Sequence, residues 1–279
     1  MRQKTEAADD LQDDFDLDDS FAAPSDSDGG DGSDSEAPDA AGGTAKKRAL
    51  HGDDAPVAAE EKKKKRRKKN SQREPAVPGA FAVPRDVDAQ AKLWNEYMLK
   101  AHPGMTRLEL GDVGVQRQHV YAVDSEPAAG PEFLVDLART AVSTGKAKGK
   151  VAFGAPQVLV ICSSALRVVD LVRRLRTVSR RPVAKLFSRH IKIDAQKQAL
   201  REMAIDVAVG TPNRIRRLLA DGDLKLNRLR LVVIDCWQDS KMRVVLDMDD
   251  TRDDLFAIWS EVLRPASANP DYMFKLRLA

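Results

Sequence analysis

Few cysteines, few histidines and the lack of any long apolar run limit what this 279-residue chain can be. No eighteen consecutive residues are apolar, so we expect no membrane segment. The acidic N-terminus also lacks the apolar stretch of a secretory signal. Cys162 and Cys236 form no C-x-x-C motif, and the four histidines are scattered. Both cysteines end predicted buried strands, which favours reduced, half-buried thiols over a disulfide or a metal site.

Charge of each sign is concentrated in a different part of the chain. Residues 1–40 contain fourteen Asp or Glu residues and two Lys or Arg residues. Such a segment buries too little apolar surface to offset the entropy lost on ordering it, about 1–2 kcal/mol per residue. We predict an acidic disordered tail over 1–45, a basic linker over 46–79 and one folded domain over 80–279. The domain has 32 Lys or Arg and 24 Asp or Glu residues, a net of +8 against +3 for the whole chain. A basic domain favours a polyanionic partner without identifying one.

The tail and the linker each support a functional hypothesis. Four apolar residues among the aspartates of the tail, Leu11, Phe15, Leu17 and Phe21, are typical of short docking motifs. A solvated tail that only keeps the protein soluble is the alternative. The linker contains eight consecutive basic residues, Lys62, Lys63, Lys64, Lys65, Arg66, Arg67, Lys68 and Lys69. This run predicts a nuclear or nucleolar localisation signal that also binds RNA phosphates, although a charge run can be a solvated spacer.

The stretch from Ile205 to Gln238 predicts a strand, a helix and a buried strand. Residues 205–209 alternate in the manner of a strand, and Thr211 and Pro212 suit the N-cap and the first position of a helix. The helix has an apolar face opposite a face of three arginines, Arg214, Arg216 and Arg217. Residues 229–234 are almost entirely apolar, as a parallel strand covered on both faces requires.

The same alternation recurs along the rest of the domain. Strands are predicted at 157–162 and 183–187, and helices at 85–100, 131–142, 164–178 and 194–203. This order is typical of an α/β fold with a single doubly wound parallel sheet. Arg167 is expected on the solvent face of its helix, and Asp235 is expected to cap a strand end. Residues 242–248 can return to the sheet, Thr251 is expected to open a capping box for a helix that ends before Pro265, and residues 271–279 form a strand or a tail.

Two short motifs resemble the first RecA-like domain of DEAD-box RNA helicases. The motifs are G-T-P-N-R at Gly210 to Arg214 and V-V-I-D at Val232 to Asp235. In that family, T-P-G-R holds the RNA backbone and D-E-A-D handles magnesium and water. The resemblance therefore implies a RecA-like fold of the P-loop NTPase type. This chain departs from the pattern, because Cys236 and Gln238 stand where the second and fourth residues of D-E-A-D would be.

The loop STGKAKGK at Ser143 to Lys150 does not meet the requirements of an ATP-binding P-loop. Gly145 and Gly149 are separated by three residues, Val151 replaces the magnesium-binding hydroxyl, and a predicted helix precedes the loop. Phosphoryl transfer depends on the phosphate cradle and on metal-positioning carboxylates, and both are altered here. We therefore predict no catalytic residues, no metal and no cofactor. A divergent ATP-binding, helicase-like protein is the alternative.

The whole arrangement is similar to that of the Cms protein family: an acidic tail, a lysine-arginine run and a degenerate DEAD-box-like domain with V-G-T-P-N-R-I and V-V-I-D. The resemblance implies a nucleolar factor of the small-subunit processome, the earliest pre-ribosomal particle. Its partners would be pre-ribosomal RNA and processome proteins, with no small-molecule substrate. We predict RNA-backbone contacts from the helix N-terminus and the basic loop, through Thr211, Asn213, Arg214, Lys146, Lys148 and Lys150. In the alternatives, Arg214 pairs with Asp206 or Asp221 at the surface, or the protein is a scaffold without direct RNA contact.

Overall fold

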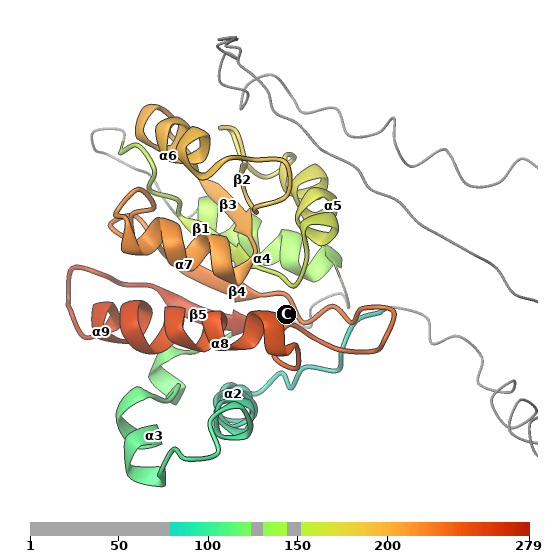
Figure 1. Ribbon diagram of the computed structural model, residues 1–279, viewed down its shortest axis with the longest axis vertical. Helices are drawn as coiled ribbons and strands as arrows, with labels where there is room; N and C mark the ends of the chain where they lie inside the picture. The colour runs from blue at the N-terminus through green and yellow to red at the C-terminus, as the bar shows by residue number, and fades with distance from the viewer. Residues whose placement is uncertain (1–78, 124–130, 144–151) are drawn as a thin grey trace, which may run out of the picture. The chain divides into compact units, whose positions relative to one another are not determined.

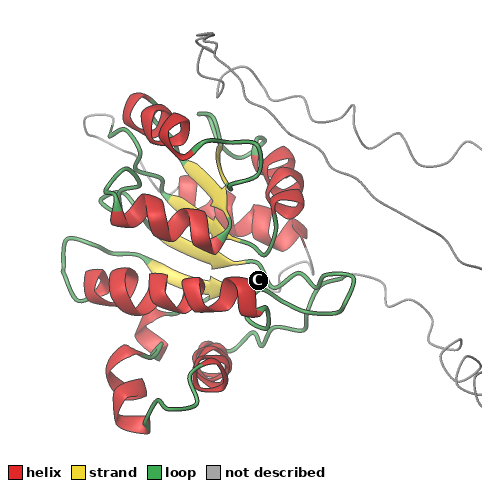
Figure 2. Cartoon of the chain, in the orientation of Figure 1, coloured by secondary structure: helices red, strands yellow, loops and turns green. Residues whose placement is uncertain are grey.

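The computed structural model of the chain describes residues 79–123, 131–143 and 152–279. Within them a five-stranded sheet has the order β2-β3-β1-β4-β5, and every neighbouring pair is parallel. Figures 1 and 2 show the sheet between layers of helices. The predicted α/β class and doubly wound parallel sheet are confirmed. The strands are β1 (Val158–Ile161), β2 (Ala184–Leu186), β3 (Val207–Gly210), β4 (Leu231–Ile234) and β5 (Lys275–Leu278).

Helices cover both faces of this sheet. They are α2 (Val87–Ala101), α3 (Arg107–Val113), α4 (Pro131–Ser143), α5 (Ala165–Leu175), α6 (Ile193–Glu202), α7 (Pro212–Ala220), α8 (Asp249–Ala257) and α9 (Arg264–Ser267), with a 3-10 turn at Arg117–His119 and a π turn at Ile258–Leu263. In Figure 1, α7 and α8 lie in front of the sheet and α4 lies behind it. Among the described helices, none combines the length and the hydropathy that a bilayer crossing needs.

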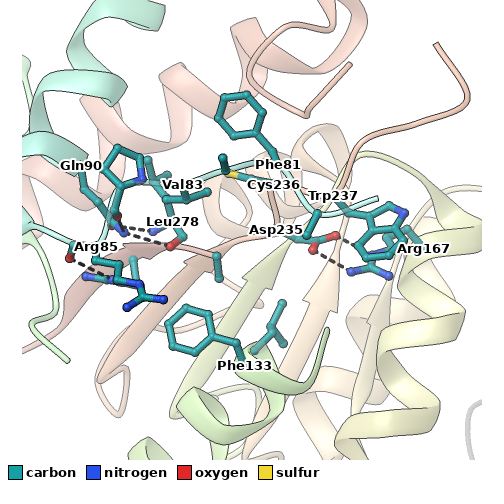
Figure 3. Close-up of a pocket in the computed structure, with 16 residues that line it drawn as sticks. Phe81, Val83, Arg85, Gln90, Phe133, Arg167, Asp235, Cys236, Trp237 and Leu278 are labelled. Atoms are coloured by element: carbon teal, nitrogen blue, oxygen red, sulfur yellow. Dashed lines mark hydrogen bonds and ion pairs between the residues drawn. The ribbon is translucent and has the colours of Figure 1, made fainter. Parts of the chain in front are cut away.

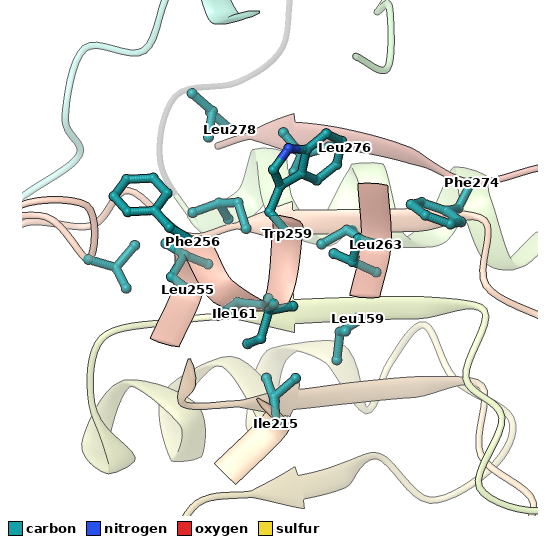
Figure 4. Close-up of a cluster of buried hydrophobic side chains, with 14 of the residues drawn as sticks. Leu159, Ile161, Ile215, Leu255, Phe256, Trp259, Leu263, Phe274, Leu276 and Leu278 are labelled. Atoms are coloured by element: carbon teal, nitrogen blue, oxygen red, sulfur yellow. The ribbon is translucent and has the colours of Figure 1, made fainter. Parts of the chain in front are cut away.

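The alternation of side chains along each strand divides the apolar core into two halves. Val158 and Val160 of β1 pack with α4 and α5 on one face, whereas Leu159 and Ile161 pack with the helices of the other face. On the second face the aromatic rings of α2 and α8 meet: the centroids of Trp94 and Phe256 are 5.2 Å apart. Figure 4 shows Phe256, Trp259 and Leu263 of this face packed over β1, β4 and β5.

The region after β4 differs from its prediction. Residues 242–248 form no strand, because Asp239 closes a turn: its Oδ1 accepts the Arg243 N–H at 2.9 Å. Helix α8 begins at Asp249, and the Thr251 hydroxyl donates to the Val245 and Met248 carbonyls instead of capping. The helical path also continues past Pro265, because the wide π turn before it is followed directly by α9. Residues 275–278 form strand β5.

The parallel strands all point their carboxyl ends at one edge of the sheet, the edge at which ligands bind in open α/β folds. The residues that directly follow four of the strands, Cys162, Thr211, Asp235 and Ala279, are thereby brought to that edge. The acidic tail, and the basic linker apart from Gly79, lie outside the described residues.

Candidate functional site

The first part of the site is the N-terminus of α7. The Thr211 N–H donates to the Leu186 carbonyl of β2 at 2.9 Å, and Pro212 begins the helix. The Thr211 side chain forms no capping hydrogen bond to any described residue. The N–H groups of the first helical turn, which form the positive end of the helix dipole, therefore point outward at the carboxyl edge of the sheet. Asn213 is exposed there, and its side-chain amide donates to Asp254 of α8 at 3.1 Å.

Arg214 is buried, with 7% of its surface exposed, so its expected place on a solvent-facing side of α7 is wrong. Its guanidinium donates to the Gln196 side-chain oxygen at 2.8 Å and to the Ile191 carbonyl at 3.1 Å. It therefore does not pair with Asp206 or Asp221, the surface alternative. Burial lowers the pKa of Arg214, and the charge of Arg217 lowers it further. Arg214 thus joins α7 to the segment that opens α6, and its predicted contact with RNA stays a prediction.

That neighbouring segment, Ser188 to Lys192, connects β2 to α6 and was not among the predicted site residues. Arg189 and Lys192 are exposed, and His190 has a left-handed backbone with φ 61°. Lys192 is the N-cap residue of α6, and within the described residues its side chain makes no capping hydrogen bond. Arg189, Lys192, Thr211 and Asn213 together form what we call the β2–β3 rim. Two exposed cations and two helix N-termini lie there, with Asp194 and Asp254 as the nearby carboxylates.

The remaining predicted RNA-binding residues fall in other places. Lys146, Lys148 and Lys150 of the basic loop lie outside the described residues, as does the localisation run from Lys62 to Lys69. Their contributions stay predictions.

Asp235, at the end of β4, forms a buried ion pair with Arg167 of α5. Both carboxylate oxygens accept from the guanidinium, Oδ2 from Nε at 2.7 Å and Oδ1 from NH2 at 2.9 Å. Asp235 is 3% exposed. The Arg167 guanidinium also lies over the Trp237 ring, 4.4 Å from its centroid. The expected solvent-facing Arg167 is therefore wrong: it lies in the first turn of α5, and its long side chain reaches Asp235.

The protonation of these groups follows from burial. The pKa of Asp235 is raised, first by burial and then by the charge of Asp170, although the hydrogen bonds and charge of Arg167 and the Trp237 N–H lower it. Burial lowers the pKa of the Arg167 guanidinium, but Asp235, with smaller contributions from Asp170 and Cys162, raises it by more, so this pKa is raised. Burial raises the pKa of the Cys162 and Cys236 thiols, and both are free and fully buried, more deeply than predicted.

The ion pair forms one end of a pocket of about 180 Å³. Figure 3 shows Asp235, Arg167 and Trp237 at that end, Arg85 and Gln90 at the other, and Phe133 between them. Of the two remaining positions of the D-E-A-D pattern, Cys236 lines the pocket with a buried thiol, and the Gln238 amide donates to the Met242 carbonyl at 3.3 Å. Within the described residues, no group of three or more His, Cys, Asp or Glu side chains is placed to hold a metal ion.

A family profile described as "CMS1: U3-containing 90S pre-ribosomal complex subunit" matches residues 34–264. The chain belongs to this CMS1 family. Human Protein CMSS1 is 38% identical over 102 residues, which are 36% of this chain and 37% of that protein. Protein CMS1 of Chaetomium thermophilum is 36% identical over 124 residues, covering 43% of this chain and 49% of that protein. The chain thus matches less than half the length of each of these curated relatives.

Among solved structures, the CMS1-family chain is similar to DEAD-box proteins at low identity. The yeast DEAD-box splicing factor Prp28 has a TM-score of 0.39 and 14% identity, over 75% of this chain and 47% of that one. A DEAD box protein from the hyperthermophile Methanococcus jannaschii has a TM-score of 0.34 and 14% identity, over 70% of this chain and 44% of that one.

Proposed function

We propose that this protein is a non-enzymatic, RNA- and protein-binding subunit of the small-subunit processome, located in the nucleolus and acting in small-subunit rRNA maturation. Membership of a family described as a subunit of the U3-containing 90S pre-ribosomal complex supports the assembly. The basic linker run supports the nuclear location, and the net charge of +8 over residues 80–279, from 32 Lys or Arg and 24 Asp or Glu residues, supports an RNA partner.

The observation that carries the non-enzymatic part of the proposal is the closed pair of Asp235 and Arg167. Nucleotide hydrolysis of the helicase type needs carboxylates that are free to position a metal ion and its water. Here both oxygens of Asp235 accept from one guanidinium, which Trp237 covers. Leaving one charge of a buried ion pair without its partner costs about 3–5 kcal/mol. The next residue, Cys236, offers a protonated, buried thiol in place of a carboxylate.

RNA is proposed to bind along the β2–β3 rim through its phosphates. The first turn of α7 after Pro212 supplies N–H groups and a positive dipole end, the Thr211 hydroxyl and the Asn213 side chain add polar groups, and Arg189 and Lys192 supply charge. Arg214 acts here as a positioning residue, since it fixes α7 against the segment that carries the two cations. The basic loop and the linker run add further phosphate contacts. Contacts to the backbone position RNA without reading its sequence, so binding depends strongly on salt and weakly on sequence.

Anisotropy titrations of a labelled single-stranded RNA with the full chain, at several salt concentrations, test the rim. Replacing Arg189 and Lys192 together by Ala removes two phosphate contacts, and the slope of log affinity against log salt should become shallower by about 1.4. A matched control removes two exposed charges from α2 and α3, Lys92→Ala with Arg107→Ala, far from β2 in Figure 1. The assignment of the rim is wrong if the two double variants have the same slope.

A further inference from the structure

Arg277 of β5 is a buried cation with no carboxylate partner among the described residues. It is 2% exposed, and its two terminal nitrogens donate to the Tyr121 and Arg85 carbonyls at 3.0 and 3.1 Å. Its Nε is buried and has no hydrogen-bond partner in the described part of the chain. The guanidinium lies 5.9 Å from the centroid of the Phe133 ring. A buried charge of this kind is costly unless an anion completes its hydrogen bonds.

The pocket beside Arg277 combines this charge with an apolar wall. Arg277 lines the same pocket as the Asp235–Arg167 pair. Most of the other lining is apolar, contributed by Phe81, Val83, Pro84, Phe133, Leu134, Trp237 and Leu278. The acidic groups among the described lining are Asp235, which Arg167 neutralises, and the terminal carboxylate of Ala279, whose oxygen accepts from the Cys236 N–H at 2.6 Å. The guanidinium groups of Arg85, Arg167 and Arg277 outnumber them. The pocket therefore fits a ligand that carries both a carboxylate and a bulky apolar group.

We propose that the occupant is a segment of this same chain, Leu11 to Phe21, whose sequence is LQDDFDLDDSF. Apolar residues alternate there with aspartates. An aspartate carboxylate pairs with the charge of the Arg277 guanidinium at the pocket wall, while Phe15 or Leu17 fills the apolar part of the pocket. This gives the acidic docking pattern of the tail a binding site, and the proposal does not depend on RNA binding.

The position at which the folded domain begins favours binding of residues 11–21 to this pocket. Residues 80–85 line the pocket, and they are fixed beside β4 by backbone bonds from Gln238 N to Gly79 O at 2.8 Å and from Phe81 N to Cys236 O at 3.3 Å. Residues 22–78 separate the segment from this point. For the disordered tail and linker that the sequence predicts, a chain of that length has a root-mean-square end-to-end distance of about 40 Å. Such tethering gives an effective concentration on the order of 1 mM, enough to saturate even a weak site.

A competition experiment on the full-length chain tests the proposal. A labelled synthetic peptide with the sequence of residues 11–21 is titrated with three chains: the natural one, a tail variant (Phe15→Ala with Leu17→Ala) and a matched control (Leu50→Ala with Val57→Ala). A site with a Kd of about 0.1 mM would be about nine-tenths occupied by its own tail at an effective concentration near 1 mM. The tail variant frees its own pocket and should then bind the peptide about tenfold more tightly than the other two chains. A peptide with its five aspartates replaced by asparagine should bind at least tenfold more weakly.

Hydrogen exchange of residues 80–85 and 275–279 locates the contact without disturbing the folded domain. Exchange should be slower in the natural chain and in the control than in the tail variant, and addition of the peptide should restore protection to the tail variant. Equal peptide affinity for all three chains, or unchanged exchange, overturns the proposal. It is also overturned if exchange accelerates in an Asp124→Asn, Glu126→Gln variant and not in the tail variant, because the acidic partner of Arg277 would then come from residues 124–130.

Discussion

Replacing Arg167 by Met should lower the free energy of unfolding by about 3–5 kcal/mol, because Asp235 remains buried without its partner. The magnitude follows from the geometry: Asp235 is 3% exposed, and both its oxygens accept from the guanidinium that is removed. Loss of the guanidinium from the Trp237 ring adds about 0.5–1 kcal/mol. Met keeps most of the aliphatic volume, so the loss measures charge and hydrogen bonding more than packing.

Two further measurements separate this cause from general damage to α5. Adding Asp235→Asn to the Arg167→Met variant removes the unpaired charge and should recover about half of the loss or more. The pKa of Asp235 is already raised by burial, and losing Arg167 raises it further. A carboxyl whose pKa is raised in the folded state penalises folding above that pKa, so the deficit of the variant should shrink as the pH falls through it.

Urea denaturation followed by circular dichroism gives the required free energies. Arg174→Met is the control on the same helix: Arg174 pairs with Glu132 at 2.9 Å, but its side chain is 41% exposed, so its loss should be under about 1 kcal/mol. The reasoning is refuted if the two single variants lose equal stability, or if Asp235→Asn makes the Arg167→Met variant worse.

Four other substitutions test stability. Gly210→Ala should cost about 2 kcal/mol or more, because a Cβ there would overlap the Leu186 carbonyl and lie 3.0 Å from Ile215 Cγ1. Gly111→Ala in α3 meets nothing within 4 Å and should instead stabilise by about 0.5–1 kcal/mol; equal effects in thermal melts contradict this. Arg214→Leu should cost about 2–4 kcal/mol by urea denaturation, since Gln196 and the Ile191 carbonyl lose a buried donor; a loss under 0.5 kcal/mol would remove its positioning role. His119 has a pKa lowered to about 4 by burial and by the charges of Arg264 and Lys275, so its stabilising effect is present above about pH 6.5 and is lost on acidification. Between pH 7 and 5 the natural chain should lose about 2 kcal/mol more than a His119→Gln variant; equal losses would contradict the shift.

The Gln116 N–H gives the neutral form of His119 a hydrogen-bond partner, in addition to the burial and the charges that lower its pKa. It donates to His119 Nδ1 at 3.0 Å, so a proton on that nitrogen would break the hydrogen bond. The imidazole also lies against the Trp259 ring, with centroids 5.4 Å apart. His119→Gln is therefore compared by its pH dependence and not by its absolute stability, which loss of this packing also changes.

The strands and most helices were predictable from sequence because their signals are local. Alternating and continuous apolar runs identify β1, β3 and β4, and Thr211-Pro212 marks the start of α7. The arginines were not predictable in this way. Helical periodicity assigns the direction of a Cα–Cβ bond, but a guanidinium lies several bonds further out. The Cα atoms of Arg167 and Arg214 lie on the polar sides of their helices, but their guanidinium groups donate to buried acceptors that are distant in the sequence. These acceptors are the Asp235 carboxylate and the Ile191 carbonyl.

The segment after β4 failed prediction for a different reason. Val244, Val245 and Leu246 are buried as a strand would be, yet they pair with no strand, because the Asp239 turn sets their path. A proline ends a helix when the turn before it keeps α-helical hydrogen bonds. The turn before Pro265 is instead the π turn at Ile258–Leu263, and the helical path continues through Pro265 into α9. The cations of Ser188 to Lys192 carried no motif, and their place beside α7 follows only from the order of β2 and β3 in the sheet.

The most direct test of the central claim, an RNA-binding domain without a nucleotide motor, measures RNA binding and ATP turnover on one preparation of the full chain. The account predicts salt-dependent RNA binding whose affinity does not change with ATP and magnesium, and no phosphate release above that of an identically purified blank, with or without RNA. RNA-stimulated release of phosphate would contradict it.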